Sequence, residues 1–66
     1  MTFGEKLKIA REKQFLSQEA MAKELGVSFS TVNRWENGKI EPNYAAKKAF
    51  HEFCLKHNIK FKGDDE

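Results

Sequence analysis

The chain has 66 residues, a formal net charge of +2 and one cysteine, Cys54. A chain this short forms a single domain that buries only about 60% of its unfolded surface, which argues against a second effector domain or a deep catalytic cleft. No apolar stretch approaches the roughly 20 residues of a membrane span, and the N-terminus lacks the apolar core of a signal peptide. One cysteine forms no internal disulfide, so we expect a reduced, cytoplasmic protein without membrane association.

The basic residues are concentrated in the front of the chain. Residues 1–48 carry nine Lys and Arg against six Asp and Glu, whereas residues 49–66 carry three against four. This modest basic excess permits phosphate binding, but a mixed solvated surface has a similar composition. The charge therefore does not by itself identify a partner.

A first helix is predicted to begin at Thr2. Thr2 followed three residues later by Glu5 is a capping-box pattern, in which side chains satisfy backbone N–H groups of the first turn. Apolar residues then recur at helical spacing, at Phe3, Leu7 and Ala10, and give the helix one buried face. The helix is expected to end near residues 13–14.

Two short helices are predicted next, on either side of Gly26. Ser17 is a good N-cap for the first of them, and Gly26 ends it because glycine readily adopts the positive φ of a helix C-terminus. Its inward side comprises Met21, Ala22 and Leu25. Ser28 then caps a helix that runs to about Asn37, and Gly38 ends this helix as well.

A fourth, longer helix is predicted after a short loop, with Asn43 as its N-cap and its end near His57. Along it, core and surface positions are mixed, at Tyr44, Phe50, Phe53 and Cys54. We therefore predict an all-α fold, a compact bundle of four to five short helices over residues 1–58. Residues 59–66 form a C-terminal tail with an alternating start, which is either a short strand, an ordered tail or a dimer contact.

The two helices around Gly26 have the residue sizes of a helix-turn-helix. Helices joined by a tight turn cross steeply, so a small residue is needed where their backbones approach, and Ala22 stands there. Gly26, four residues later, supplies the turn residue that tolerates a left-handed φ. Val32 and Trp35, three residues apart, then anchor the second of these helices to the core.

The opposite face of that second helix is polar. With Val32 and Trp35 inward, a repeat of 3.6 residues per turn places a polar set outward. This set comprises Ser30, Asn33, Arg34 and Asn37, with Phe29 on its flank. Arg can bind guanine with two hydrogen bonds, Asn can bind adenine in the same way, and an aromatic edge can contact a thymine methyl. Because a merely solvated face would more often carry Glu and Lys pairs at i, i+4 spacing, this face is predicted to read bases in the DNA major groove.

The stretches Leu16–Ala22, Gly26–Ser28 and Thr31–Gly38 resemble the Cro/phage-repressor (Xre-type) helix-turn-helix family, and the resemblance runs without gaps from about Leu7 to Pro42. It implies a lambda-repressor-like helical bundle that binds double-stranded DNA and represses or activates transcription, usually as a dimer on a palindromic site. We expect this binding to need no cofactor, and we expect no small-molecule ligand domain.

The resemblance also implies roles for individual residues. The positions at which the family reads bases are Phe29, Ser30, Asn33 and Arg34. The positions at which it commonly touches phosphates are Gln18, Ser28, Thr31, Asn37 and Lys39, where the glutamine can instead support the base-reading side chains. Arg11 and Glu36 match a pair that usually forms an internal salt bridge between the first and third helices, so a structural role is expected for both.

Two positions depart from the family pattern. Phe15 follows the first helix where the family often has glycine, so it is either an exposed aromatic or a residue that closes over the core at a changed turn. Phe29 stands where polar base-reading residues are commoner, so it contacts either a thymine methyl or a partner subunit. The chain beyond Pro42 resembles the family only loosely, so the family's dimer contact cannot be transferred.

Other functions have less support from the sequence. His51, Cys54 and His57 lack a fourth ligand and do not share one helix face, so no metal site is expected, and no catalytic arrangement indicates an enzyme. The remaining alternatives are an antitoxin or restriction-modification regulator, or a small helical protein-interaction adaptor, with Ile59 and Phe61 as partner contacts. A homodimer is a weaker prediction, based on the apolar residues of the last helix and of the tail.

Overall fold

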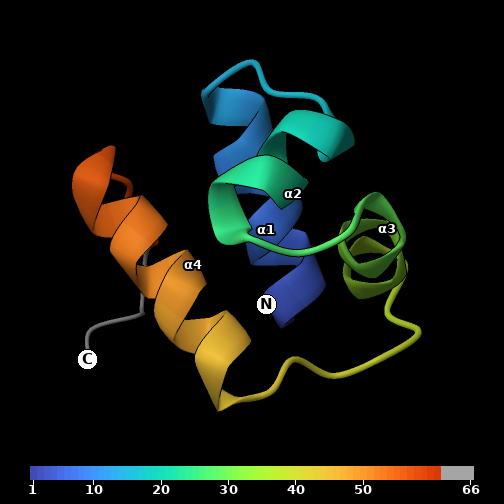
Figure 1. The fold of residues 1–66 in the computed structure, drawn as a ribbon. Helices are drawn as coiled ribbons and strands as arrows, with labels where there is room; N and C mark the ends of the chain where they lie inside the picture. The colour runs from blue at the N-terminus through green and yellow to red at the C-terminus, as the bar shows by residue number, and fades with distance from the viewer. Residues whose placement is uncertain (62–66) are drawn as a thin grey trace.

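Four helices account for most of the computed structural model, which describes residues 1–61 (Figure 1). They are α1 (Phe3–Lys13), α2 (Gln18–Leu25), α3 (Phe29–Glu36) and α4 (Tyr44–Lys56). No strand occurs within residues 1–61, so the predicted all-α fold of short helices is confirmed. None of these four helices is both long and apolar enough to cross a bilayer.

Each helix starts with a side chain that accepts a hydrogen bond from a backbone N–H group of the first turn. These caps are Thr2, Ser17, Ser28 and Asn43, all with extended backbone. At Thr2 the bond is reciprocal, because the Glu5 carboxylate accepts from the Thr2 N–H at 2.9 Å while Thr2 Oγ1 accepts from the Glu5 N–H at 3.1 Å. Such caps satisfy N–H groups that have no partner inside the helix. The four helix starts predicted from the sequence are confirmed.

All four helices end in the same left-handed turn. The residues in that conformation are Phe15, Gly26, Gly38 and Asn58, with φ between 56° and 73°. In each turn the next backbone N–H donates to a carbonyl five residues earlier, over 2.8–3.0 Å, which is the Schellman pattern. Glycine adopts this conformation without steric cost and asparagine tolerates it, whereas a bulky side chain does not. Phe15 therefore marks a local strain that the two glycine turns lack.

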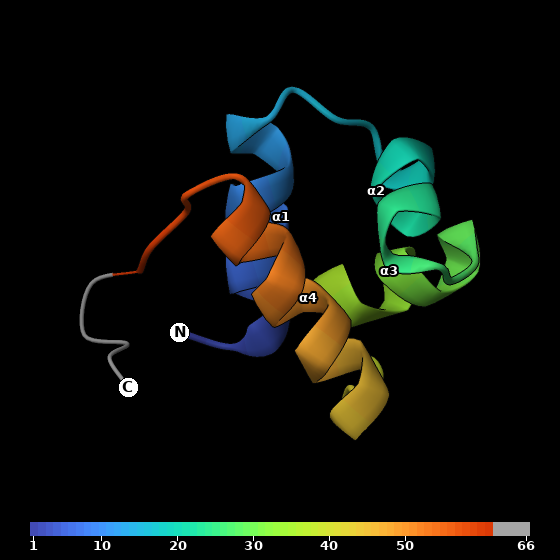
Figure 2. The ribbon, with the colours of Figure 1, turned by 60° about the vertical axis from the view of Figure 1, so that its left-hand side comes forward.

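The core lies where the helices meet. α3 packs against α1 and α2, and α4 packs against α2; Figure 2 shows the same arrangement from the side. Leu7, Met21 and Val32, one from each of the first three helices, are fully buried. The other buried apolar residues are Ala10, Ala22, Leu25, Trp35, Ala46, Phe50, Phe53, Cys54 and Ile59. The core thus contains the inward residues predicted for α2 and α3.

The start of the predicted C-terminal tail folds back onto the core. Residues 59–61 form neither a helix nor a strand. Ile59 is buried and Phe61 packs half-buried against the core, close to Phe50. These apolar side chains, which suggested a dimer contact, are therefore covered to a large extent within one chain. The rest of that tail, residues 62–66, lies outside the described residues.

Candidate nucleic-acid interface

A connection of three residues, 26–28, joins α2 to α3, and the two helices cross steeply (Figure 2). Gly26 has a φ of 73°, and the N–H groups of Gly26 and Val27 donate back to the carbonyls of Lys23 and Ala22 at 3.3 and 2.9 Å. Nothing lies within 4 Å of the place where a Cβ would stand on Gly26. The backbone conformation, rather than lack of space, therefore favours glycine at this turn.

The inward side of α3 fixes this helix to the core. Val32 is fully buried and Trp35 is 5% exposed. The Trp35 indole meets the Phe3 ring edge to face, with 5.4 Å between the ring centroids, a favourable arrangement of aromatic side chains. The two anchors predicted from the helix period are confirmed, and they determine which side of α3 faces outward.

The outward side of α3 presents a short polar surface. Ser30, Arg34 and Asn37 are exposed, and Phe29 is 48% exposed at the start of the helix. Asn33, which was expected to point outward with them, is half-buried. The predicted base-reading residues therefore share one surface, but Asn33 lies at its inner edge, against α2.

A salt bridge between α1 and α3 lies beneath this surface. The Glu36 carboxylate accepts from Arg11 Nε at 2.8 Å and from Arg11 Nη2 at 3.0 Å, while Arg11 Nη1 donates to the Leu16 carbonyl at 2.9 Å. The side chains of Arg11 and Glu36 are only 13% and 4% exposed. The hydrogen bonds to Glu36 raise the pKa of Arg11 although burial opposes this. The pair predicted between the first and third helices is therefore present.

Three amide side chains connect this salt bridge to the surface. Gln18 Nε2 donates to Glu36 Oε1 at 3.0 Å, and Asn33 Nδ2 donates to Gln18 Oε1 at 3.2 Å. Asn37 Nδ2 then donates to Asn33 Oδ1 at 3.1 Å. A carboxylate only accepts hydrogen bonds, so Gln18 must turn its Nε2 toward Glu36, and the orientation of the next two amides follows. Glu36 thus sets the direction of the whole amide chain.

The other predicted phosphate-binding residues lie at the two ends of α3. Ser28 Oγ accepts from the Thr31 N–H at 3.1 Å, and the two side-chain hydroxyls are 2.9 Å apart. Only one hydroxyl proton is used between them, so the other is available to a phosphate oxygen. Asn37 and Lys39, both exposed, lie at the opposite end of the helix. Gln18 differs from them, because its amide is engaged with Glu36 and Asn33.

The family model described as Helix-turn-helix matches residues 7–46. The chain belongs to the Xre/Cro-type helix-turn-helix family. The matched residues include α2, the turn and α3, together with most of α1. The resemblance seen in the sequence is therefore confirmed, and it covers the whole polar surface described above.

One curated helix-turn-helix protein is similar over most of this chain. It is the HTH-type transcriptional activator BcrR of Enterococcus faecalis, 40% identical over 53 residues, which are 80% of this chain and 26% of the relative. The chain thus spans about a quarter of the length of that protein. No solved structure matches the chain.

Gly4 positions this helix-turn-helix against α1, a role that the sequence did not reveal. A Cβ added to Gly4 would stand 2.0 Å from the carbonyl oxygen of Trp35. The first turn of α1 can therefore approach the end of α3 this closely only with glycine. The available signal was a glycine inside a helix that begins with a capping box, a place where glycine usually has a packing reason.

Phe15 is one of the two positions that depart from the helix-turn-helix family pattern, and the structure decides between its two interpretations. Its side chain is 95% exposed and its φ is 57°. Of the two interpretations, an exposed aromatic or a residue closing over the core, the first is correct. The left-handed φ also explains why the family often has glycine here.

A metal site with His51, Cys54 or His57 would need further ligands from elsewhere in the fold. Within residues 1–61 no group of three His, Cys, Asp or Glu side chains is placed to hold a metal ion. Cys54 is buried among core residues, whereas His51 is exposed on α4.

Proposed function

We propose that the chain binds double-stranded DNA in a sequence-specific manner and regulates transcription, with α3 in the major groove and α2 across the backbone. The observation that carries this proposal is the polar face of α3, anchored from behind by Val32 and Trp35 and presenting Arg34 at its surface. The similarity to a transcriptional activator supports the regulatory role. In a bacterium, such as the source of that relative, this activity would belong in the cytoplasm.

Asn33 and Arg34 are the proposed principal base readers, with Ser30 and Phe29 beside them. Asn33 donates one hydrogen bond to Gln18 and accepts one from Asn37, which leaves one N–H and one acceptor lone pair. Adenine offers the complementary pair in the major groove, an N7 acceptor and an N6 donor. The exposed Arg34 guanidinium has the fork geometry that guanine O6 and N7 require.

Phosphate contacts would fix the position and orientation of α3 in the major groove. Ser28 and Thr31 at the start of the helix, and Asn37 and Lys39 after its end, stand where contacts to the two sides of the groove are expected. For Gln18 the structure favours support of Asn33, with its remaining N–H as the group that could reach a phosphate.

A selection of binding sites from random duplex DNA, followed by variants, tests this proposal. Arg34→Ala should cost roughly 1–3 kcal/mol on the selected site and relax the preference at one base position. Lys39→Ala should weaken binding to all sequences alike. It should also reduce the slope of log affinity against log salt concentration by about one. Lys56→Ala removes the same charge from the exposed surface of α4 and serves as the control. No enriched sequence, or equal losses for Arg34→Ala on selected and random DNA, would contradict base reading by α3.

Two copies are proposed to assemble on the DNA rather than beforehand. The apolar residues Phe50, Phe53 and Ile59, which suggested a preformed dimer, are buried within one chain. Two copies on a two-fold site would place their recognition helices in half-sites about 34 Å apart. Sedimentation should then show a monomer without DNA and two copies on a selected site with two half-sites. A stable dimer in the absence of DNA would contradict this order of assembly.

A further inference from the structure

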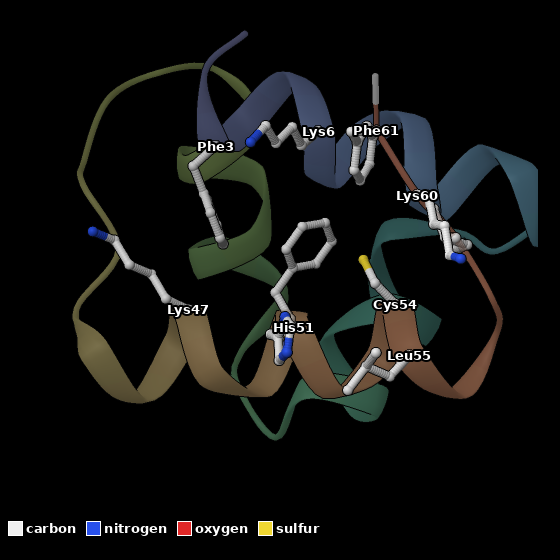
Figure 3. A pocket seen from close by; sticks show the side chains of 10 residues that line it. Phe3, Lys6, Lys47, His51, Cys54, Leu55, Lys60 and Phe61 are labelled. Atoms are coloured by element: carbon white, nitrogen blue, oxygen red, sulfur yellow. The ribbon is translucent and has the colours of Figure 1, made fainter. Parts of the chain in front are cut away.

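A groove of about 690 Å³ lies between the first turns of α1, the side of α4 and residues 59–61 (Figure 3). Its apolar lining consists of Phe3, Phe50, Cys54, Leu55, Ile59 and Phe61. The rings form a continuous floor, with centroids 5.3 Å apart for Phe3 and Phe50 and 6.3 Å apart for Phe50 and Phe61. None of the residues proposed to contact DNA lines this groove. It is therefore a second surface, separate from the face of α3.

Within residues 1–61, the charged side chains on the rim of the groove are all basic. Lys47 and Lys60 stand at opposite ends, with His51 between them, and Lys6 lies across the groove from α4 (Figure 3). The Lys6 ammonium is 5.8 Å from the centroid of the Phe61 ring. No Asp or Glu is among the described residues that line the groove. A complementary partner must therefore combine an apolar surface with negative charge.

The groove follows α4 for about two turns. Lys47, His51 and Leu55 recur every four residues, so they lie along one face of α4. The eight helical steps that separate Lys47 from Leu55 correspond to about 12 Å along the helix axis. Leu55 is 67% exposed at the lip, a large apolar side chain in contact with water. A helix that lays an apolar stripe into a groove uses anchors at i, i+3 or i+4 and i+7, which cover a similar length.

We propose that this groove binds an acidic amphipathic helix of a partner protein. The apolar stripe of that helix lies on the aromatic floor and against Leu55, and carboxylates on its flanks reach Lys47 and Lys60. A second copy of this chain is a poor occupant in a symmetric contact, because the two basic rims would then face each other.

Two synthetic peptides of about four helical turns test the charge complementarity. Both carry the same leucine stripe; one has glutamates on its flanks and the other has lysines at the same positions. We expect the glutamate peptide to bind the full chain at least about tenfold more tightly at low salt. In a ¹⁵N-labelled protein, its binding should shift the backbone amides of α4 and residues 59–61, and leave those of α3 unchanged.

Matched variants of α4 locate the contact. Lys47→Glu should weaken binding of the glutamate peptide about fivefold or more, since it reverses a charge on the rim. Lys48→Glu, on the next exposed residue of the same helix, gives the same net charge but lies outside the groove, so a change below about twofold is expected. Leu55→Ser should weaken binding about tenfold, and because Leu55 is exposed this variant should keep its fold.

Several outcomes would overturn the proposal. Equal affinity for the two peptides would contradict the proposed charge complementarity. Equal losses of peptide affinity for Lys47→Glu and Lys48→Glu would contradict a contact at the rim. Amide shifts centred on α2 and α3 would place the peptide elsewhere. If the glutamate peptide binds only after Asp64, Asp65 and Glu66 are changed to Asn, Asn and Gln, the groove serves the chain's own acidic residues and not a partner.

Discussion

Replacing Glu36 by glutamine tests what the salt bridge beneath α3 contributes to stability. Glu36 accepts two hydrogen bonds from Arg11 and one from Gln18. Glutamine has the same shape, but one acceptor oxygen becomes an NH₂ group, which must then face a donor of Arg11 or of Gln18. The Arg11 guanidinium also loses its counter-charge in a largely buried position. Glu36→Gln should therefore destabilise the fold without creating a cavity.

The size of the effect follows from the burial of the pair. Removing one partner of a fully buried ion pair costs roughly 3–5 kcal/mol. Because Arg11 is 13% exposed, water compensates part of the loss, and we expect the free energy of unfolding to fall by about 2–3 kcal/mol. Glu52→Gln is the matched control, since Glu52 and Lys48 are 3.9 Å apart and both 63% exposed. The same chemical change there should cost less than about 0.5 kcal/mol.

Urea unfolding, followed by the fluorescence of Trp35, measures both variants. Trp35 is the one tryptophan of the chain and is 5% exposed, so unfolding changes its environment strongly. The difference between the two variants should be about 2 kcal/mol and should persist at high salt, which screens exposed pairs more than buried ones. Equal losses for Glu36→Gln and Glu52→Gln would refute the reasoning.

Glu36→Gln also has a readout at the proposed DNA surface. If the new NH₂ group faces Gln18, the amides of Gln18, Asn33 and Asn37 can turn over together, because nothing then fixes their direction. The base preference at the position read by Asn33 should broaden in a repeated site selection. An unchanged preference would mean that Glu36 does not set the orientation of Asn33.

Three further substitutions test the turns and close contacts. Gly4→Ala should destabilise the fold by at least about 2 kcal/mol in urea unfolding, since its Cβ would stand 2.0 Å from the Trp35 carbonyl oxygen; a neutral effect would show that α1 and α3 can separate freely. Phe15→Gly should stabilise it by about 1 kcal/mol in thermal unfolding, because φ is 57° and the side chain is 95% exposed; a loss of stability would reveal a contact for the ring. Ser28→Ala should cost about 1 kcal/mol through loss of the cap on the Thr31 N–H, and it should also weaken DNA binding if Ser28 contacts a phosphate; unchanged unfolding would contradict the cap.

The helix ends and the core could be predicted from the sequence because both depend on local patterns. A cap such as Ser17 acts on a backbone group within the first turn, and the spacing of Val32 and Trp35 reveals the inward face of α3. The amide chain is different, since Gln18 and Glu36 are 18 residues apart and Arg11 and Glu36 are 25 apart. No local pattern indicates such contacts, and only the family resemblance suggested the ion pair.

The half-buried state of Asn33 and the position of the tail also depend on neighbouring elements. The helix period predicts that Asn33 points outward, and only the contact with Gln18 of α2 explains why it is partly covered. The sequence likewise shows that residue 59 is an apolar isoleucine. It does not show whether the core of the same chain or a second chain covers this side chain. The close approach at Gly4 is a property of the crossing between α1 and α3, which no single helix specifies.

The proposed DNA surface consists of a part that is tied to the fold and a part that is not. Asn33 belongs to the first, because its orientation depends on Gln18 and, through it, on the salt bridge that joins α1 to α3. Phe29, Ser30 and Arg34 belong to the second, since they are exposed and outside the core. Substitutions at exposed positions usually change stability by less than about 0.5 kcal/mol. A change of DNA target would therefore arise most readily through these three residues. Asn33 would keep the same orientation, because its hydrogen bond to Gln18 holds it in place.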